Sequence, residues 1–509
     1  MRCVMLMMRD SMGCDPMRFA LTLAALLAAG TAAAAPAPDP LTTLGLPAIQ
    51  PGIGVQLDRL VTIPAEPGAT AAPLARINYV IPVPDATGRL FVADVDGQVF
   101  RTSTSGAAPS LYFDLQQQGV AASQIAGGTA HGLQSIAFHP NFNGDPALPG
   151  YGKFYTSYTT YAGTATLGSG GNPGAQVAIR EWTTDPTAAT YTPTAPSRLV
   201  MQIAGYSDDH SSGLISFNTS AAPGSADYGN LYIGSGDGLY NDGNQKAQQP
   251  GEPQGKMLRI NPLQSGALAY TIPAGNPFVG AAGTLPEIWA TGLRYPQSFG
   301  WDKLTGKMYI NDLGQAYVEE VDLGVAGANY GWSQREGTFA TGYAYGLPSD
   351  DEHVYPVTPD ALPGGPYTDP IAQFDHNGAY AAIGSGFVYR GAGIPGLYGM
   401  YVFEDIVTGD AYYFDPATAV PGGPTQLYSL QFNLGGAPVE LYTSSLGYGG
   451  DYTQRADARL SQLNDDELVI ALKGTGDVLR LDALAVPEPA TLALLLTLAV
   501  PALWRRVRD

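Results

Sequence analysis

Apolar residues in this chain occur in short runs, and no long helical period is found between residues 44 and 484. Residues 77–83, 89–94 and 98–101 are three successive runs of this kind, and they are separated by turn-forming Asp, Pro and Gly residues. Short runs with such turns between them are typical of β-strands that are joined as hairpins. The pattern therefore predicts an all-β protein.

The predicted strands fall into a repeating unit, which consists of a first strand, a hairpin and a final strand that carries a charged residue. About six such units share roughly 440 residues, a period of about 70 residues, which fits a β-propeller with long loops. We therefore predict a β-propeller over residues 44–485, and the pattern alone leaves the number of blades open. A pair of β-sandwiches is the alternative, because the repeat is irregular. In a propeller the ends of the inner strands converge on a central funnel, so residues that are distant in sequence meet there.

Charge and cysteine content narrow the possible functions. The net charge is −20, with 25 basic and 45 acidic residues. Nucleic-acid binding needs clustered Lys and Arg, so we expect no nucleic-acid partner, whereas acidic side chains suit Ca²⁺. The two cysteines, Cys3 and Cys14, both precede the apolar leader described next, so we expect neither a disulfide nor a catalytic thiolate in the mature protein.

Both ends of the chain are predicted to be targeting segments. Residues 17–37 contain one arginine, an apolar run and then small residues, which is the layout of a secretory signal peptide, and residues 1–16 extend it at the N-terminus. At the other end, residues 486–509 contain a Pro-Glu-Pro tripeptide, a short apolar segment and a basic cluster. The apolar segment is shorter than the roughly 20 residues of a spanning helix, so we expect a short hydrophobic helix that anchors the protein only transiently.

This C-terminal segment resembles the PEP-CTERM sorting signal of Gram-negative bacteria that make extracellular polysaccharide. The resemblance rests on its three parts, which occur in order at the extreme C-terminus. It implies that an exosortase recognises and removes the tail. It also implies export to the cell surface or the extracellular space, with transient membrane association.

Two strand ends place a base and a carboxylate near each other. His210 opens one predicted strand region, and Asp237 lies in a Gly-Asp-Gly turn at the end of the next. Each residue alone is common in ordinary turns. Together at one sheet edge they are a candidate site for proton abstraction, because the pKa of an imidazole lies near neutrality.

A series of motifs across residues 78–481 resembles the soluble glucose/sorbosone dehydrogenase family. The shared motifs, in chain order, are GLQSIAFHPNF, HSSG, LYIGSGDG, GKMLRINP, PEIWATGLRYPQ, GQAYVEEVD and GANYGW. The resemblance implies a six-bladed propeller that oxidises aldoses with pyrroloquinoline quinone (PQQ) and Ca²⁺ and passes electrons to an external acceptor. Hedgehog-interacting-type proteins share the module.

The resemblance also implies roles for individual residues. His210 matches the catalytic base, Asp237 the carboxylate that orients it, and Arg294 the cation beside the quinone oxygens. The backbone carbonyls of Gly314 and Gln315 match the ligands of the Ca²⁺ that bridges to PQQ, so the side chain of Gln315 is expected to matter little.

The resemblance implies roles for further positions. Glu320 and the carbonyl of Tyr330 match a second, structural Ca²⁺ site. Arg390 and Arg459 are candidate cations for the carboxylates of PQQ, and His131 is interpreted either as a site-lining residue or as a structural turn histidine. One departure from the family pattern is Tyr295, which occupies a position that is commonly Asn.

Three functional interpretations follow from the sequence. The first is an exported PQQ- and Ca²⁺-dependent dehydrogenase that acts on the anomeric carbon of an aldose or oligosaccharide. The second is a catalytically inactive propeller that binds glycan or protein at the cell surface or in the extracellular matrix. The third is a metal-dependent hydrolase or lactonase, which would need several carboxylates around one accessible Ca²⁺.

Overall fold

The computed structural model describes residues 38–66, 68–70, 72–121, 132–168, 175–205, 210, 213–238, 245–347, 353–357, 365–376, 381–441 and 456–484. The predictions for the signal peptide, for His131 and for the C-terminal tail therefore lie outside the described residues. The chain divides into two compact units, residues 1–39 and 40–509, and every described strand belongs to the second unit.

Regular structure in the described residues is almost entirely β. These residues form 28 strands and three short 3-10 helices, namely η2 (Lys246–Gln248), η3 (Gly342–Tyr345) and η4 (Pro395–Leu397). None of the described helices is long and apolar enough to cross a membrane. The prediction of an all-β protein is confirmed.

Four antiparallel sheets contain four strands each and form the first four blades. The first comprises β2 (Ile77–Pro82), β3 (Arg89–Asp94), β4 (Gln98–Ser103) and β5 (Ser110–Asp114). The second comprises β6 (Leu133–Phe138), β7 (Lys153–Thr160), β8 (Gln176–Thr184) and β9 (Pro193–Ile203). The third comprises β10 (Ile215–Phe217), β11 (Leu231–Ser235), β12 (Lys256–Ile260) and β13 (Ile288–Thr291). The fourth comprises β14 (Pro296–Trp301), β15 (Met308–Asp312), β16 (Val318–Gly324) and β20 (Ala372–Asp375).

The last two blades are joined through the first strand of the chain. The fifth blade comprises β21 (Ile383–Val388), β22 (Tyr401–Asp405), β23 (Ala411–Phe414) and β24 (Tyr428–Leu434), with β25 (Ala437–Pro438) added at its edge. The sixth comprises β26 (Ala458–Gln462), β27 (Leu468–Leu472), β28 (Asp477–Ala483) and β1 (Gln50–Thr62). Strand β1 pairs antiparallel with β28 and parallel with β24, so the N-terminal strand completes the last blade.

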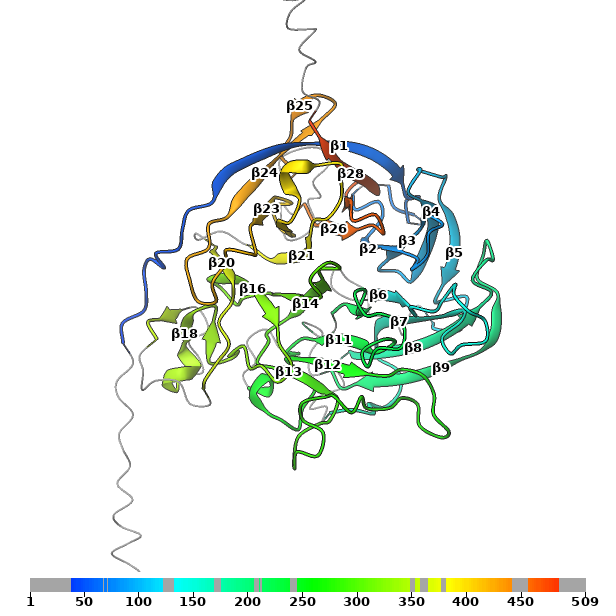
Figure 1. The fold of residues 1–509 in the computed structure, drawn as a ribbon, viewed down its shortest axis with the longest axis horizontal. Helices are drawn as coiled ribbons and strands as arrows, with labels where there is room; N and C mark the ends of the chain where they lie inside the picture. The colour runs from blue at the N-terminus through cyan, green and yellow to red at the C-terminus, as the bar shows by residue number, and fades with distance from the viewer. Residues whose placement is uncertain are drawn as a thin grey trace, which may run out of the picture. The chain divides into compact units, whose positions relative to one another are not determined.

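The six blades form a closed ring. Their inner strands β2, β6, β14, β21 and β26, with β10 and β11 of the third blade, contact one another in sequence, and β26 returns to β2 (Figure 1). A small additional sheet of β17 (Arg335–Glu336), β18 (Phe339–Thr341) and β19 (Val354–Tyr355) is inserted between β16 and β20 of the fourth blade. The six-bladed propeller is the arrangement observed, and the sandwich alternative was wrong.

Apolar side chains from neighbouring blades pack between the sheets. Between the first two blades, Phe91 contacts Phe138 with ring centroids 4.9 Å apart, and Phe113 contacts Trp182 edge-on at the same separation. Edge-to-face aromatic pairs of this kind contribute roughly 0.5–1.5 kcal/mol beyond the burial of their area. The aromatic positions in the strand pattern therefore form the cores that hold adjacent blades together.

His139 is a buried structural histidine in the turn after β6. Its Nδ1 accepts a hydrogen bond from the backbone N–H of Asn141 at 3.0 Å, and its ring packs edge-on against Phe217. Burial lowers the pKa of His139 to about 4. Since the ordinary pKa of histidine is about 6.5, this group contributes stability that is fully present above pH 6.5 and is lost as the pH falls toward 4.

We therefore expect the pH dependence of stability to change when His139 is replaced by asparagine, whose side-chain oxygen keeps an acceptor near the Nδ1 position. Between pH 7 and pH 4.5 the wild-type protein should lose about 2 kcal/mol more unfolding free energy than His139→Asn. Urea denaturation at both pH values measures this difference. Identical pH dependence in the two proteins would contradict the assignment.

Candidate functional site

The candidate site lies at the mouth of the central channel where the inner strands begin. His210 precedes β10 and Arg294 precedes β14, and the two strand starts are adjacent because the N–H of Leu214 donates to the carbonyl of Gln297 at 3.3 Å. The N–H of Asp237 donates to the carbonyl of Arg294 at 2.7 Å, which ties the third blade to the fourth. The fold thus brings together three of the predicted residues.

His210 and Asp237 form a hydrogen-bonded pair. The Nδ1 atom of His210 lies 3.0 Å from Oδ1 of Asp237, whose side chain is fully buried, whereas the histidine side chain is 15% exposed. A carboxylate accepts the hydrogen bond, so the neutral imidazole carries its proton on Nδ1. The lone pair of Nε2 is therefore available as a base.

The backbone around His210 has an unusual conformation. His210 has a φ of 46°, in the left-handed region that residues other than glycine seldom adopt. A Cβ atom on Gly236 would lie 2.1 Å from the carbonyl oxygen of His210, so only glycine fits at that position. The ring of Tyr295 stacks on the imidazole with centroids 4.9 Å apart and an interplanar angle of 19°. Tyr295, the departure from the family pattern, therefore restricts how the base can turn.

Arg294 is buried and held by hydrogen bonds. Its Nε donates to Oε1 of Gln315 at 2.9 Å and its Nη1 donates to the carbonyl of Leu313 at 3.3 Å. The side chain of Gln315 thus has a contact of its own, in addition to the backbone carbonyl that the resemblance singled out as a ligand. The backbone N–H groups of Arg294 and Tyr295 donate to Asp312, a carboxyl whose burial raises its pKa to about 8.

Trp332 connects the histidine pair with the arginine. Its indole Nε1 donates to Oδ2 of Asp237 at 2.9 Å, and the guanidinium of Arg294 lies 5.6 Å from its ring centroid. In the sequence, this tryptophan was notable only as the last letter of the GANYGW motif. Its role depends on a contact between residues 95 positions apart in the chain.

The loop at Gly314 and Gln315 leaves two carbonyl groups available. The N–H groups of residues 315–318 all donate to Oε1 of Glu336, over 2.8–3.0 Å. The N–H of Gly314 is directed to Glu319 at 3.3 Å. The carbonyls of Gly314 and Gln315 accept no hydrogen bond from the described residues, and the prediction that they bind a cation stays a prediction.

A group of buried carboxylates follows this loop on β16. Glu320 and Asp322 are both buried, and Oε2 of Glu320 and both oxygens of Asp322 have no hydrogen-bond partner within the described part of the chain. Burial raises the pKa of both carboxyls well above the ordinary range, and the negative charge of Asp322 raises that of Glu320 further. The hydroxyl of Tyr330 donates a hydrogen bond to the carbonyl of Leu323, the residue after Asp322, at 2.6 Å, and burial, followed by the charge of Asp322, raises the pKa of this phenol. Asp322 is a candidate ligand that the sequence analysis missed, although it ends the quoted GQAYVEEVD motif.

Arg390 does not join this group, and its prediction as a cofactor-binding residue is corrected. Arg390 follows β21, and its Nε and Nη2 donate to both carboxylate oxygens of Asp302 at 2.9 and 2.7 Å. Asp302 follows β14, whereas Arg294 precedes it. Arg390, which is bound to Asp302, therefore lies near the end of β14 that is opposite to Arg294. The FVYRG motif indicated a suitable residue type but not the end of the strand at which it lies.

Arg459 lies at the same mouth of the channel as Arg294, where the inner strands begin. It is at the start of β26, and its Nη1 lies 2.9 Å from Oδ1 of Asp457. Lys473, which follows β27, lies 3.0 Å from the other oxygen of Asp457. Both cations are buried, and Lys473 was not singled out in the sequence.

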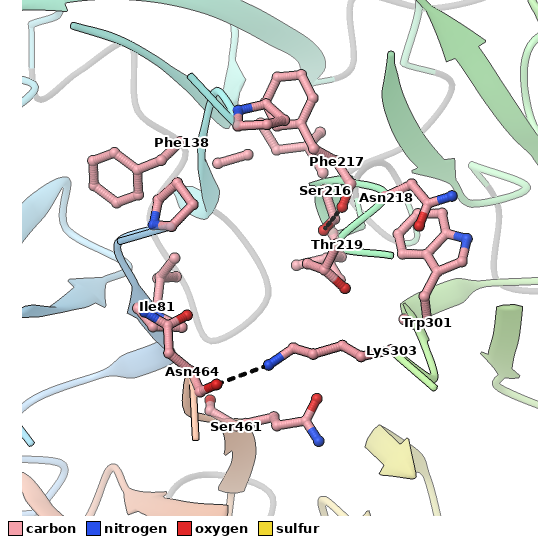
Figure 2. A pocket seen from close by; sticks show the side chains of 18 of the residues that line it. Ile81, Phe138, Ser216, Phe217, Asn218, Thr219, Trp301, Lys303, Ser461 and Asn464 are labelled. Carbon is pink, nitrogen blue, oxygen red and sulfur yellow. Dashed lines mark hydrogen bonds between the residues drawn. The ribbon is translucent and has the colours of Figure 1, made fainter. Parts of the chain in front are cut away.

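A cavity of about 440 Å³ occupies the opposite part of the central channel. Its lining runs from the middle of the inner strands into the loops that follow them, and Figure 2 shows Phe138, Phe217 and Trp301 around it, with Lys303 bonded to Asn464 at its edge. None of the predicted site residues lines this cavity.

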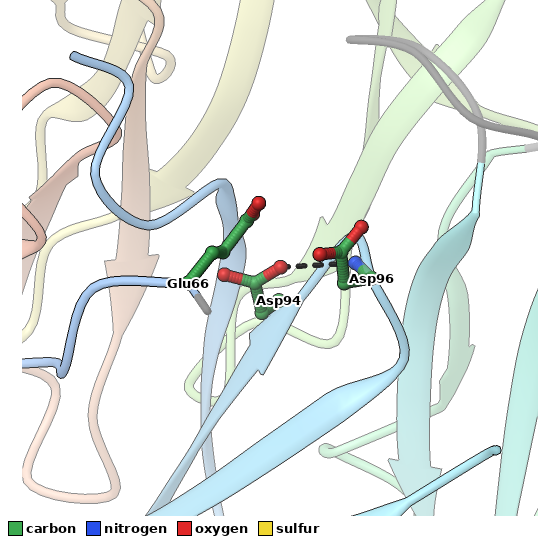
Figure 3. Close-up of side chains that lie close together, drawn as sticks. All are labelled: Glu66, Asp94 and Asp96. Atoms are coloured by element: carbon green, nitrogen blue, oxygen red, sulfur yellow. Dashed lines mark hydrogen bonds between the residues drawn. The ribbon is translucent and has the colours of Figure 1, made fainter. Parts of the chain in front are cut away.

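A third polar group is an acidic cluster in the first blade. The carboxylate oxygens of Glu66, Asp94 and Asp96 lie within 4.8 Å of one another (Figure 3). The guanidinium of Arg76 binds Glu66 at 2.8 Å and also pairs with Asp96. We interpret this cluster as an ion-pair network, since an arginine already neutralises part of its charge.

Comparison with known proteins identifies the family. A model of the Glucose / Sorbosone dehydrogenase family matches residues 79–403. The HIPL2 protein of Arabidopsis thaliana is 24% identical over 364 residues, which cover 64% of this chain and 50% of that protein. The Hedgehog-interacting protein of Mus musculus is 26% identical over 324 residues, which cover 63% of this chain and 40% of that protein. The chain thus spans half or less of these relatives.

Solved structures share the fold. The PQQ-bound form of an aldose sugar dehydrogenase from Streptomyces coelicolor has a TM-score of 0.54 and 17% identity, covering 85% of this chain and 99% of that one. At this level of identity the similarity establishes the propeller fold alone. Because the family model covers more than half of its residues, the chain belongs to the glucose/sorbosone dehydrogenase family.

Proposed function

We propose that this protein is an exported quinoprotein dehydrogenase that oxidises the anomeric carbon of an aldose or oligosaccharide by hydride transfer to PQQ. The observation that carries the proposal is the joint placement of His210, Asp237 and Arg294 at one mouth of the channel. A neutral imidazole held on Nδ1 by a buried carboxylate is equipped to remove a proton. A buried guanidinium beside it is equipped to stabilise negative charge.

Each residue has a defined part in this reaction. The Nε2 atom of His210 takes the proton of the anomeric hydroxyl, and Asp237 holds the imidazole in the required tautomer and stabilises the imidazolium that forms. When bound, PQQ would supply the two-electron acceptor for the hydride, and an external acceptor would be needed to complete the cycle. Arg294 lies where it can compensate the negative charge that the oxidation generates.

The residues present fit the two expected groups. PQQ carries three carboxylates, and Arg294, Arg459 and Lys473 are buried cations at strand ends on this side of the propeller, the last two paired with Asp457. For the Ca²⁺ beside PQQ, the free carbonyls of Gly314 and Gln315 are suitable oxygen ligands. For a second Ca²⁺, the unpartnered oxygens of Glu320 and Asp322 need a cation, and the Tyr330 carbonyl is the third candidate ligand.

The test is direct titration of the purified protein with PQQ in the presence of Ca²⁺, followed by assays with a panel of aldoses and a dye acceptor. We expect Arg294→Met to weaken PQQ binding about 10- to 100-fold, the range for losing one or two charge-assisted hydrogen bonds. Arg180→Met is the matched control, because Arg180 also lies over a tryptophan, Trp182, at 5.8 Å in the second blade. It should leave PQQ affinity unchanged.

The titration can also contradict the proposal. Absence of tight PQQ binding to the wild-type protein would remove the support for the dehydrogenase. It would favour the second candidate, a propeller that binds glycan or protein at the cell surface without catalysis. The observation in favour of that candidate is that one relative is named for an interaction, the Hedgehog-interacting protein. The hydrolase interpretation finds less support, because Glu320 and Asp322 are buried rather than gathered around an accessible metal position.

A further inference from the structure

We infer that Trp332 is a positioning residue that holds the base and the cation of the site in one arrangement. The effect on catalysis rests on the proposed function. The positioning itself rests on the contacts of Trp332. Trp332 is 3% exposed and reaches the site from the segment that follows β16. Its edge and its face contact different partners.

The edge of the indole fixes Asp237. One carboxylate oxygen of Asp237 binds His210 at 3.0 Å, and the other accepts the indole N–H of Trp332 at 2.9 Å. A carboxylate that is held on both oxygens cannot rotate about its Cβ–Cγ bond without breaking a buried hydrogen bond, which is costly. Trp332 therefore determines where Oδ1 lies, and through Oδ1 it determines which ring nitrogen of His210 carries the proton.

The face of the indole supports Arg294. The guanidinium lies 5.6 Å from the ring centroid, within the range of a cation–π contact. Arg294 keeps two further contacts, to Gln315 and to the Leu313 carbonyl, which do not depend on the tryptophan. A substitution that removes the N–H and keeps an aromatic face should therefore disturb Asp237 and His210 more than Arg294.

The tryptophan itself is anchored. Its backbone N–H donates to the carbonyl of Gly292 at 2.9 Å, and its carbonyl accepts a hydrogen bond from Nε2 of Gln248 at 2.5 Å. These two contacts tie the segment that follows β16 to Gly292, after β13, and to Gln248 in η2. The indole is thus placed by the backbone rather than by the groups that it contacts, as expected of a residue that positions others.

The first test needs neither cofactor nor activity. The chain has five histidines, so ¹⁵N-histidine labelling gives few signals, and His210→Gln identifies those of His210. At a pH where His210 is neutral, the wild-type protein should show the Nδ1–H tautomer, and Trp332→Phe should raise the Nε2–H population several-fold. The control is Trp182→Phe, which removes another buried indole hydrogen bond, to Thr156 at 2.9 Å, and should leave these signals unchanged.

A second variant covers the case in which Trp332→Phe does not fold. Incorporation of 3-benzothienylalanine at position 332 replaces the indole N–H by sulfur and preserves the shape of the ring system. It should produce the same tautomer shift. If His210 keeps its wild-type tautomer in this protein while Asp237→Asn changes it, Trp332 does not act through Asp237 and the inference is overturned.

The kinetic test separates positioning from structure. In the PQQ-loaded enzyme, Trp332→Phe should lower kcat about 10-fold or more, with sugar KM and PQQ affinity changed less than threefold. Added to Asp237→Asn, it should lower kcat less than a further twofold, because both changes act on the same carboxylate. Full additivity would contradict the inference. If PQQ does not bind at all, the proposed function fails, and the tautomer measurement still decides the role of Trp332.

Discussion

Replacement of His210 by glutamine is expected to lower kcat/KM for aldose oxidation about 10³-fold, within the range for loss of a general base. Glutamine retains a neutral amide N–H donor next to the fully buried carboxylate of Asp237, and the other oxygen of that carboxylate keeps the indole N–H of Trp332. It has no basic nitrogen to take the proton of the anomeric hydroxyl. Steady-state assays with a dye acceptor measure the loss in activity.

PQQ binding distinguishes this effect from misfolding. Because Arg294 is held by Gln315 and Leu313 and not by the histidine side chain, His210→Gln should bind PQQ within about threefold of the wild-type affinity. His139→Asn is the matched control, since it alters another buried histidine, in the turn after β6, and should retain activity at neutral pH. A glutamine variant with more than a tenth of wild-type activity would exclude His210 as the base.

Removal of Ca²⁺ is expected to produce the largest change in stability. Three oxygens of Glu320 and Asp322 are buried without hydrogen-bond partners in the described part of the chain, and burial raises the pKa of both carboxyls. A bound cation would let both ionise without repulsion. At a Ca²⁺ concentration 100 times its dissociation constant, binding to the folded state contributes about 2.7 kcal/mol. Thermal unfolding with Ca²⁺ and with a chelator measures this difference.

The sign of the pH dependence provides a second readout. In the chelated protein the folded-state pKa values lie above the ordinary ones, so the contribution of these carboxyls is present at low pH and is lost as the pH rises through the raised values. The calcium effect should therefore be larger at pH 8 than at pH 5.5. Glu320→Gln combined with Asp322→Asn should remove it.

A control cluster is available in the same protein. Asp96 belongs to the acidic group of the first blade, in which Arg76 already pairs with the carboxylates. Asp96→Asn should therefore leave the calcium-induced shift intact. If Asp96→Asn removes the shift and the Glu320/Asp322 variant keeps it, the cation site is in the first blade instead.

The strand pattern was sufficient for the all-β class and for six repeating units, because alternation and turn residues are local properties of the chain. It did not include β1, which pairs with β28 more than 400 residues later. Closure of a ring by the N-terminal strand depends on where the last blade ends, and no local pattern contains that information.

His210, Asp237 and Arg294 were predictable because each lies in a motif at a strand end, where side chains converge in a propeller. Arg390 was misplaced, because a motif specifies a residue type and only the direction of β21 decides which mouth it faces. Trp332 and Asp322 needed the tertiary structure for a different reason. The importance of an indole N–H or of a carboxylate oxygen depends on what is buried beside it, and burial is a property of the packed fold. The sequence alone determined the architecture and the candidate functional groups. Tertiary packing decided which of those groups contact one another.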